Sequence, residues 1–415
     1  GFFSDRILKF TSVFRDRGLT IKNLDRSKFE VIVFTSESKQ TEFNNEDEIY
    51  IKKTLDDVVD SVDKIVYLSS ISRKTVEQIA NYELDILVYP DIGMDAPTFY
   101  MAHSRLAPVQ INTWGHSKTS GIDTIDYYFS SKYFELENYE QANSHYSEKL
   151  VLFDSLSTCY PKFPISDFFP REDLKNYPVK EQDEGVNVLF CLQNPRKISL
   201  EFMRILYKLH TDYKDRFVIL LLDGTKYKGD HLITRFQDQF KDPTFFGETI
   251  RIIEECTFIR YNSYMYHSDL VLDTYPFGCC NSSLEAFMKG KVVITRPARF
   301  LSGRFTLGFY NRMGINEGPI ARDNEEYIEK NKKKTRKKFQ TDTGEIDIFA
   351  LSKDKKTFLV IELKKGRLSD KVVGQIQRYM GYIKQEIAND DQNVKGLIIG
   401  LEDSIALKRA ISINP

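Results

Sequence analysis

The feature that most constrains the fold of this chain is a repeated alternation between short apolar runs and amphipathic stretches of helical length. Over residues 1–155, runs such as FEVIVFT, LDILVYP and VQINTWG alternate with helical stretches such as SRKTVEQIANYEL. The alternation returns over residues 186–328, from VNVLFCL to KVVITRP. This pattern is typical of βαβ units around a parallel sheet. We therefore expect an α/β fold with two Rossmann-like domains that face each other across a ligand-binding cleft.

The remaining segments differ in composition from these two halves. Residues 156–185 are rich in proline, which suits a connection better than the interior of a helix or strand. Residues 329–338 are strongly basic and predict a linker. The pattern then becomes strand, strand, helix, strand, helix over residues 339–415. We expect a separate small α/β domain there, near the lower size limit for an independent core.

Composition and charge exclude several classes of protein. With 41% hydrophobic and 13% aromatic residues, the 415-residue chain can build real cores and is not a disordered protein. Its net charge of −1 creates no overall attraction to nucleic acid or to an anionic membrane. No apolar run approaches the ~18 residues of a membrane span, so we expect no membrane partner. The chain does not start with methionine, as expected of a fragment of a longer protein.

Cysteines and lysines give two weaker indications. The five cysteines form no CxxC pair and are odd in number, which disfavours a disulfide framework and a zinc site and favours the reducing cytoplasm. The run KNKKKTRKK, residues 330–338, is the one strong local concentration of positive charge. Such runs most often face water, but this one could also contact phosphate groups.

The stretch DTYPFGCCNSSLEAF, residues 273–287, predicts a strand end, a turn of small residues and the start of a helix. Small residues let the backbone approach a ligand, and the free N–H groups at a helix start attract a diphosphate. Glu285 lies in the first turn of that helix, where its carboxylate could accept hydrogen bonds from ribose hydroxyls. An ordinary capped helix is the alternative, with Asn281 or Ser282 as N-cap and Glu285 as its capping partner.

Four segments, in order, resemble the catalytic region of the O-GlcNAc transferase family and its bacterial cytoplasmic protein glucosyltransferase relatives. They are LDILVYPDIGMD, LAPVQINTWGHSKTSGIDTIDYYF, VLFCLQNPRKI and HSDLVLDTYPFGCCNSSLEAFMKGKVVITRPARFLSGRF. Four ordered segments are more specific than one glycine-containing turn. The resemblance covers roughly residues 1–325. It implies a GT-B fold and transfer of a sugar from a UDP-sugar to a protein acceptor, with inversion and without a catalytic metal.

The same resemblance implies roles for individual residues. Lys197 corresponds to a lysine on the diphosphate, where a fixed cation stabilises the charge that develops on the UDP leaving group. Gln193 corresponds to a position beside it in the nucleotide pocket. The diphosphate-binding turn and the acid that contacts the nucleoside correspond to Asn281, Ser282, Ser283 and Glu285. The loops that close over the sugar and the acceptor correspond to Asp91, Gly93, His116, Ser120 and Gly121.

The chain departs from the family in two respects. A histidine that is common in the family aligns near KFTSVFRDRG, where this chain has Phe10 and Thr11. The helical repeats with which many relatives grip their protein acceptors have no counterpart in the sequence, so the acceptor cannot be read from it.

The stretch GEIDIFALSKDKKTFLVIELKKG, residues 344–366, predicts two short strands that carry charged residues. Strand alternation puts Glu362 and Lys364 on one face of the second strand, and pairing with the first strand brings Asp347 to them. The two carboxylates would hold Mg²⁺ through oxygen ligands, and the lysine would orient water and offset charge on a phosphate. Ordinary surface ion pairing is the alternative.

This second pattern resembles the PD-(D/E)XK nuclease superfamily, most closely the C-terminal domain of the NucS mismatch endonucleases. The matching motifs are TDTGEIDIFA, VIELKKGRLSDKVVGQIQRYMGYI and VKGLIIG, within residues 337–415. The resemblance implies a metal and catalytic set of Asp347, Glu362 and Lys364, a supporting pair of Gln375 and Tyr379, and DNA as partner. Relatives place a helix before the first strand, where this chain has ARDNEEYIEKNKKK.

Three hypotheses follow from the sequence. The first is an active UDP-sugar glycosyltransferase with the C-terminal domain as an accessory. The second is a Mg²⁺-dependent DNA endonuclease on a degenerate transferase scaffold, motivated by Phe10 in place of the expected histidine. The third is a non-catalytic, chimeric fragment.

Overall fold

The computed structural model describes most of the chain, in two compact units, Gly1–Lys334 and Thr335–Pro415. The described residues are 1–9, 11–36, 49–69, 72–162, 186–191, 193–213, 216–222, 232–253, 258–333, 339–342, 344–352, 356–364 and 371–400. Phe10, residues 163–185 of the predicted connection, residues 334–338 of the basic run and the predicted last helix lie outside them.

The first half of the first unit is a parallel sheet of seven strands in the order β3-β2-β1-β4-β5-β6-β7. The strands are β1 (Phe2–Phe3), β2 (Ile32–Ser36), β3 (Lys64–Leu68), β4 (Ile86–Tyr89), β5 (Val109–Thr113), β6 (Tyr127–Ser131) and β7 (Lys149–Phe153). The helices are α1 (Ser12–Lys22), α2 (Ile49–Val59), α3 (Arg73–Ala80), α4 (Ala96–Ala102) and α5 (Tyr139–Asn143). Phe34, Leu87 and Tyr89 are completely buried in this half.

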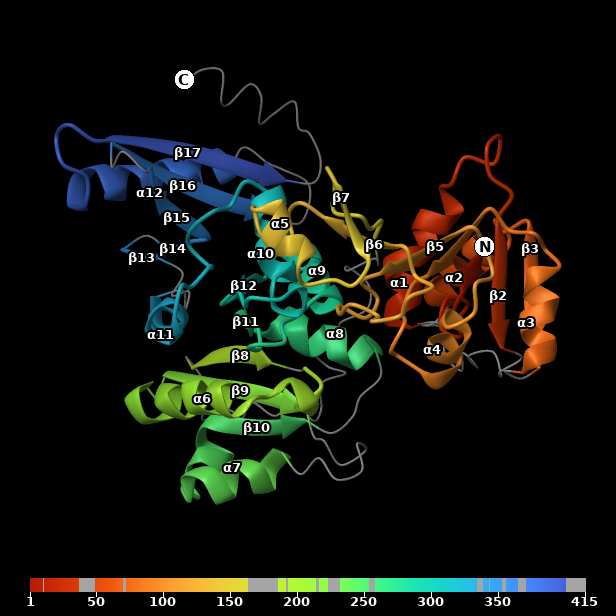
Figure 1. Cartoon of the computed structure of the whole chain (residues 1–415). Helices are drawn as coiled ribbons and strands as arrows, with labels where there is room; N and C mark the ends of the chain where they lie inside the picture. Colours follow the sequence, from red (N-terminus) through yellow and green to blue (C-terminus); the bar gives the residue numbers. More distant parts are fainter. Residues whose placement is uncertain are drawn as a thin grey trace. The chain divides into compact units, whose positions relative to one another are not determined.

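The second half is a parallel sheet of five strands in the order β10-β9-β8-β11-β12. The strands are β8 (Asn187–Cys191), β9 (Phe217–Leu222), β10 (Ile250–Ile253), β11 (Leu270–Leu272) and β12 (Val292–Ile294). The helices are α6 (Leu200–Tyr213), α7 (Leu232–Phe240), α8 (Phe258–His267), α9 (Asn281–Met288), α10 (Phe305–Arg312) and α11 (Asn324–Lys333). Helix α6 lies along this sheet (Figure 1) and buries Phe202 and Leu206 in the same core as Ile219 of β9.

An apolar cluster joins the two halves of the first unit. Trp114, just after β5, contacts Phe305 of α10 at 5.1 Å between ring centroids, and Phe134 contacts Phe305 at the same distance. The guanidinium of Arg304 donates to the carbonyl oxygens of Phe134 and Glu135 at 2.7 and 3.1 Å. These contacts hold the carboxyl end of β5 close to the second half, so the expected α/β architecture of two facing Rossmann-like domains is confirmed.

The elements of the second unit are β13 (Phe339–Thr341), β14 (Gly344–Ile346), β15 (Ile348–Leu351), β16 (Thr357–Lys364), α12 (Lys371–Glu386) and β17 (Asn393–Gly400). The unit contains more strands than predicted, because the predicted first strand is divided at Asp347 into β14 and β15 and is preceded by β13; the second predicted strand, the helix and the following strand are present. Strand β16 pairs antiparallel with β15 and parallel with β17. Helix α12 covers β16 and β17 (Figure 1), and Ile376, Tyr379 and Ile383 of this helix are buried with Val360 of β16.

None of the described helices in either unit combines the length and the apolar character that crossing a lipid bilayer requires.

Candidate functional site

A cavity of about 630 Å³ opens between the two halves of the first unit. Its walls come from the carboxyl ends of β5 and β8, from the loop after β11, and from α1 and the start of α9. Ligands of open parallel sheets bind at such strand ends. The predicted site residues that line it are His116, Gln193, Lys197, Asn281, Ser282 and Glu285.

Lys197 is held as a fixed cation in this cavity. It ends a short 3₁₀ helix, Pro195–Lys197, which Asn194 caps by accepting a hydrogen bond from the N–H of Arg196. The Lys197 ammonium donates to Gln193 Oε1 at 3.1 Å and to the carbonyl oxygen of Gly278 at 3.0 Å. It also lies 4.6 Å from the ring centroid of Phe277. Lys197 is therefore positioned before any ligand arrives.

The turn before α9 is organised by a buried acid that the sequence reasoning did not single out. Asp273 Oδ1 accepts from the N–H of Cys279, and Asp273 Oδ2 accepts from Thr295 Oγ1 at 2.7 Å. Gly278 passes so close that a Cβ there would lie 2.8 Å from Asp273 Oδ1. The turn thus needs the small residue that the sequence supplies.

Helix α9 begins without a side-chain cap. Cys280 is the N-cap residue and makes no capping hydrogen bond through its side chain, so the alternative of an ordinary capped helix is wrong. Gln193 donates instead to Ser282 Oγ at 2.8 Å, and Asn281 Nδ2 donates to the carbonyl oxygen of Ser12 at 3.1 Å. The start of α9, with its positive end of the helix dipole, faces the cavity next to Lys197.

Glu285 connects the two halves rather than capping its own helix. Its Oε1 accepts from Arg15 of α1 and from the hydroxyl of Tyr160, the latter at 2.7 Å. Lys289, the C-cap residue of α9, donates to the backbone carbonyl of Glu285 at 3.1 Å, and burial lowers the pKa of the Lys289 ammonium to about 8. A nucleoside bound at Glu285 would therefore meet Arg15 and Tyr160 as well.

His116 lines the first-half side of the cavity, and Gly93 packs against its ring. Gly93 has a φ of +95°, and a Cβ there would lie 2.8 Å from His116 Cδ2. Asp91 is completely buried and its Oδ2 accepts from Ser4 Oγ at 3.0 Å. Burial and the nearby charge of Lys118 lower the pKa of His116, so the imidazole is neutral near pH 7 and can accept a proton.

Five of the predicted residues do not line the cavity: Asp91 and Gly93, described above, and Ser283, Ser120 and Gly121. Ser283 is completely buried, and its hydroxyl shares a hydrogen bond of 2.8 Å with Thr306. The N–H of Ser120 donates to Glu148 Oε1 at 2.9 Å, and the N–H of Gly121 donates to Ser147 Oγ at 3.1 Å. These contacts give Ser283 a packing role and order the loop after His116.

The sequence reasoning missed Arg15 and Asp16, which line the cavity, and Tyr160, which contacts Glu285 of the cavity wall. Asp16 is 4% exposed and lines the cavity beside Asn281. Burial raises the pKa of Asp16 to about 7 against the opposing charges of Arg17 and Arg15. Nothing in the spacing of these residues indicates a site, because α1 and α9 lie far apart in the sequence and Tyr160 belongs to the predicted connection.

In the second unit, the strand register brings the predicted carboxylates together. The antiparallel ladder ends at the pair of Ile348 and Ile361. Glu362 is the next residue of β16, and Asp347 is the residue just before β15, at the bend between β14 and β15. Glu362 is 2% exposed and shares the helix-covered face of β16 with Val360, so surface ion pairing is wrong for this residue. Lys364 is the last residue of β16, and the structure describes its backbone only.

Of the predicted supporting pair, Gln375 contacts Glu362 directly, and Tyr379 contacts Gln375. Gln375 Nε2 donates to Glu362 Oε1 at 2.8 Å and to the hydroxyl of Tyr379 at 3.0 Å. Gly344, with a φ of +137°, lies so close that a Cβ there would be 2.7 Å from the Tyr379 hydroxyl. The first strand motif and the helix motif therefore meet around one buried carboxylate.

The second unit offers oxygen ligands of the kind that Mg²⁺ takes. Mg²⁺ commonly keeps several waters and uses one or two protein carboxylates, which Asp347 and Glu362 can supply. Within the described parts of the chain, no group of three or more His, Cys, Asp or Glu residues could hold a metal ion.

Comparison with known proteins gives different matches for the two parts of the chain. Residues 318–408 match the family model of the endonuclease NucS C-terminal domain. This match includes α11, although α11 belongs to the first unit, where Tyr327 is completely buried and its hydroxyl donates to the carbonyl oxygen of Asp273 at 2.8 Å.

The chain is also similar to UDP-glucose:protein N-beta-glucosyltransferases of Actinobacillus pleuropneumoniae, from serotype 7 (strain AP76) and serotype 5b (strain L20). Each is 22% identical over 246 residues, which cover 59% of this chain and 37% of the relative. The chain thus spans little more than a third of the length of these relatives.

Among solved structures, a mutant of the Thermobaculum terrenum O-GlcNAc transferase is similar, with a TM-score of 0.65 and 20% identity. The alignment covers 81% of this chain and 59% of that one. This likeness shows the fold, and the chain therefore has a GT-B glycosyltransferase fold joined to a NucS-like C-terminal region.

Proposed function

We propose that the first unit is an inverting, UDP-sugar-dependent glycosyltransferase that acts on a protein side chain. The observation that carries the proposal is the fixed ammonium of Lys197 beside the uncapped start of α9 in a cavity of suitable size. The similarity to UDP-glucose:protein N-beta-glucosyltransferases and to an O-GlcNAc transferase supports it and favours UDP-glucose or UDP-GlcNAc as donor.

The donor diphosphate would lie between Lys197 and the first turn of α9. Backbone N–H groups and the positive end of the helix dipole attract phosphate oxygens without needing a metal ion. As the bond between the sugar and the diphosphate breaks, negative charge grows on the leaving UDP. A cation that is already in place stabilises this charge without reorganisation, so Lys197 acts mainly in the transition state.

The nucleoside would bind farther along the same cavity, where Gln193 and Glu285 lie. Ribose hydroxyls would donate to the Glu285 carboxylate, which has acceptor capacity beyond the Oε1 bonds from Arg15 and Tyr160. Because these two partners come from outside the second half, nucleoside binding would draw both halves together.

The acceptor would enter on the side of His116. Its nucleophilic atom attacks the anomeric carbon from the face opposite UDP, the bond to UDP breaks, and the acceptor loses a proton. Neutral His116 is the proton acceptor in this proposal, with Gly93 and Asp91 packed behind the loop that holds it.

The cytoplasm, with its reducing conditions, fits the four described cysteines, all of which are free.

The function is tested by incubating the full chain with labelled UDP-glucose or UDP-GlcNAc and a panel of unfolded proteins, with EDTA present. We expect UDP release and label transfer that fall at least about 100-fold in Lys197→Ala, as for removal of a transition-state contact. Arg196→Ala is the matched control, because Arg196 is exposed on the same short helix and does not line the cavity. Equal activity of the two variants would refute the role of Lys197.

A second candidate function, Mg²⁺-dependent DNA cleavage, has its own supporting observation in the second unit. Gln375 holds the buried carboxylate of Glu362, and Asp347 directly precedes Ile348, which pairs with the neighbouring Ile361; the two carboxylates would hold Mg²⁺. When bound, Mg²⁺ would polarise a phosphodiester. Gln375 and Tyr379 would keep the Glu362 carboxylate oriented, and the NucS-like match favours DNA as the substrate.

This candidate is tested by measuring cleavage of branched and mismatched DNA with and without Mg²⁺. Loss of cleavage in Glu362→Gln and its retention in Lys197→Ala would support it. Equal cleavage by the native chain and Glu362→Gln would attribute any activity to a contaminant.

A further inference from the structure

A second cavity, of about 650 Å³, lies in the first half and shares no lining residue with the donor cavity. Residues from one face of the first sheet, among them Val88, Ile111 and Phe129, form much of its wall. Three large apolar side chains in the wall remain notably exposed, Phe29 at 47%, Ile86 at 39% and Phe153 at 38%. This much open apolar surface around a cavity indicates a place that a ligand covers.

The cavity also has a buried cation with unused donors. Arg17 of α1 is 6% exposed, its guanidinium lies 4.2 Å from the ring centroid of Trp114, and its Nη1 donates to the carbonyl oxygen of Ser157. Among the residues that the structure describes, Nε and Nη2 of Arg17 have no hydrogen-bond acceptor. A buried charged group with unmet donors is costly, and an added acceptor would relieve that cost.

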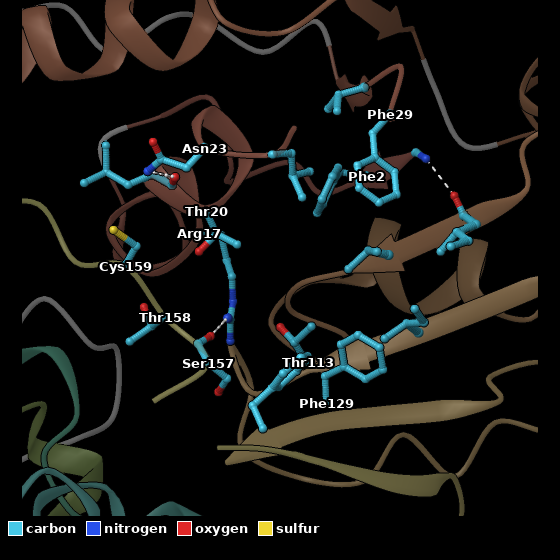
Figure 2. Close-up of a pocket in the computed structure, with 18 of the residues that line it drawn as sticks. Phe2, Arg17, Thr20, Asn23, Phe29, Thr113, Phe129, Ser157, Thr158 and Cys159 are labelled. Atoms are coloured by element: carbon cyan, nitrogen blue, oxygen red, sulfur yellow. Dashed lines mark hydrogen bonds between the residues drawn. The ribbon is translucent and has the colours of Figure 1, made fainter. Parts of the chain in front are cut away.

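The polar wall around Arg17 and the apolar wall of phenylalanine rings lie on opposite sides of the second cavity. Figure 2 shows Arg17, Ser157 and Thr158 on one side of the cavity and the rings of Phe2, Phe29 and Phe129 on the other. A ligand with a charged head and an apolar body matches this division.

We propose that this cavity binds a small amphipathic carboxylate, with its head at Arg17 and its hydrocarbon chain along the phenylalanine rings. Nε and Nη2 form one edge of a guanidinium, and this edge matches the two oxygens of a carboxylate. Both nitrogens are covered in the present structure, so the head reaches them after a rotation of the Arg17 side chain. The volume lies within the range of small-molecule sites, about 300–1,000 Å³.

The chain provides its own reporter for this site. Trp114 is the single tryptophan in the sequence, and it stacks on Arg17. The test titrates dodecanoate, below its micelle concentration, into the full chain and follows tryptophan fluorescence. Dodecanol, of equal chain length but uncharged, is the matched ligand. We expect saturable binding of dodecanoate that is at least ten-fold tighter than that of dodecanol; equal affinity would overturn the proposal.

The same titration is repeated with saturating UDP, because Trp114 also lines the donor cavity. Binding of dodecanoate persists with UDP present if the site is the second cavity. Competition between the two ligands would place the signal in the donor cavity and overturn the assignment.

Two sets of variants locate the head and the chain. Arg17→Met should weaken dodecanoate binding at least ten-fold and leave dodecanol binding unchanged. Phe153→Glu and Phe153→Lys remove the same exposed ring from the edge strand β7 but differ in charge. The lysine variant should bind dodecanoate several-fold more tightly than the glutamate variant, a comparison that holds even if Arg17→Met does not fold. Equal binding by this pair, or unchanged binding in a folded Arg17→Met, would refute the anion site.

Discussion

The two candidate sites differ in how their residues are spread along the chain. The donor cavity combines Arg15 of α1, Lys197 after β8 and Glu285 of α9, so it exists only when both halves of the first unit are folded together. The carboxylate site takes Asp347, Glu362, Gln375 and Tyr379 from a single strand, strand and helix segment.

The donor cavity therefore depends on packing between distant parts of the chain, whereas the carboxylate site depends on the pairing of neighbouring strands. The first is built around a fixed cation at a helix start, which suits a diphosphate. The second is built around a buried carboxylate, which suits a metal ion. Each of the following changes should affect one site and spare the other.

The largest expected effect concerns the carboxylate site. Glu362→Gln keeps an acceptor for Gln375 but removes the charge, so we expect DNA cleavage to fall at least about 100-fold with the fold intact. UDP binding should be unchanged. The measurement is the rate of cleavage in Mg²⁺, with calorimetric UDP binding as control; a parallel loss of UDP binding would show that the two sites are coupled.

The same substitution should have opposite effects on stability in two helices. A Cβ on Gly308 of α10 would lie 2.3 Å from the ring of Phe134 and 2.7 Å from the backbone oxygen of Tyr133, whereas Gly381 of α12 has open space. Gly308→Ala should destabilise the first unit by about 1–3 kcal/mol through overpacking. Gly381→Ala should stabilise the second unit by ~1 kcal/mol. Thermal unfolding of both variants tests this, and equal shifts would contradict it.

Stability should depend on pH through Asp16. Its raised pKa, about 7, means that the native state binds this proton more strongly than the unfolded state, whose ordinary pKa is 3.8. Between these values the native state holds more protons, so stability falls as pH rises. The free energy of unfolding changes by ~1.4 kcal/mol per pH unit for each proton. From pH 5 to pH 7, the free energy of unfolding of Asp16→Asn should therefore fall by about 2 kcal/mol less than that of the native chain. Denaturant unfolding at both pH values is the measurement; an unchanged pH slope would argue against it.

The smallest expected effect separates two neighbouring serines of α9. Ser283→Ala loses the hydrogen bond to Thr306 and should reduce stability by about 1 kcal/mol without changing UDP affinity. Ser282→Ala, in the cavity wall, should weaken UDP binding several-fold with little change in stability. Calorimetry of UDP binding and thermal unfolding distinguish the two variants. Weaker UDP binding by Ser283→Ala would contradict the prediction and show that Ser283 contributes to the donor site.

Much of the fold follows from the sequence because strand and helix periodicities are local. The βαβ alternation predicts both parallel sheets, and the pairing of β15 with β16 is a hypothesis raised by the two short strands predicted over residues 344–366. The Gln375 contact was expected from the resemblance and is observed.

The parts that sequence reasoning missed depend on long-range packing. Arg15 and Tyr160 reach Glu285 only because α10 and the Trp114 cluster hold the two halves together. Ser283 matches a family motif, but its side chain points into the core. The predicted segment boundaries stay a prediction, as does the part that Lys364 plays.

The central claim is that the first unit holds a nucleoside diphosphate without a metal ion, and calorimetric titration of UDP into the full chain with EDTA present tests it most directly. We predict micromolar binding that weakens about 10–100-fold in Lys197→Ala, as for loss of a hydrogen bond to a charged group, and that is unchanged in Arg196→Ala. A well-folded chain that binds no UDP, or binds it equally in both variants, would contradict the account and leave the carboxylate site of the second unit as the leading candidate for activity.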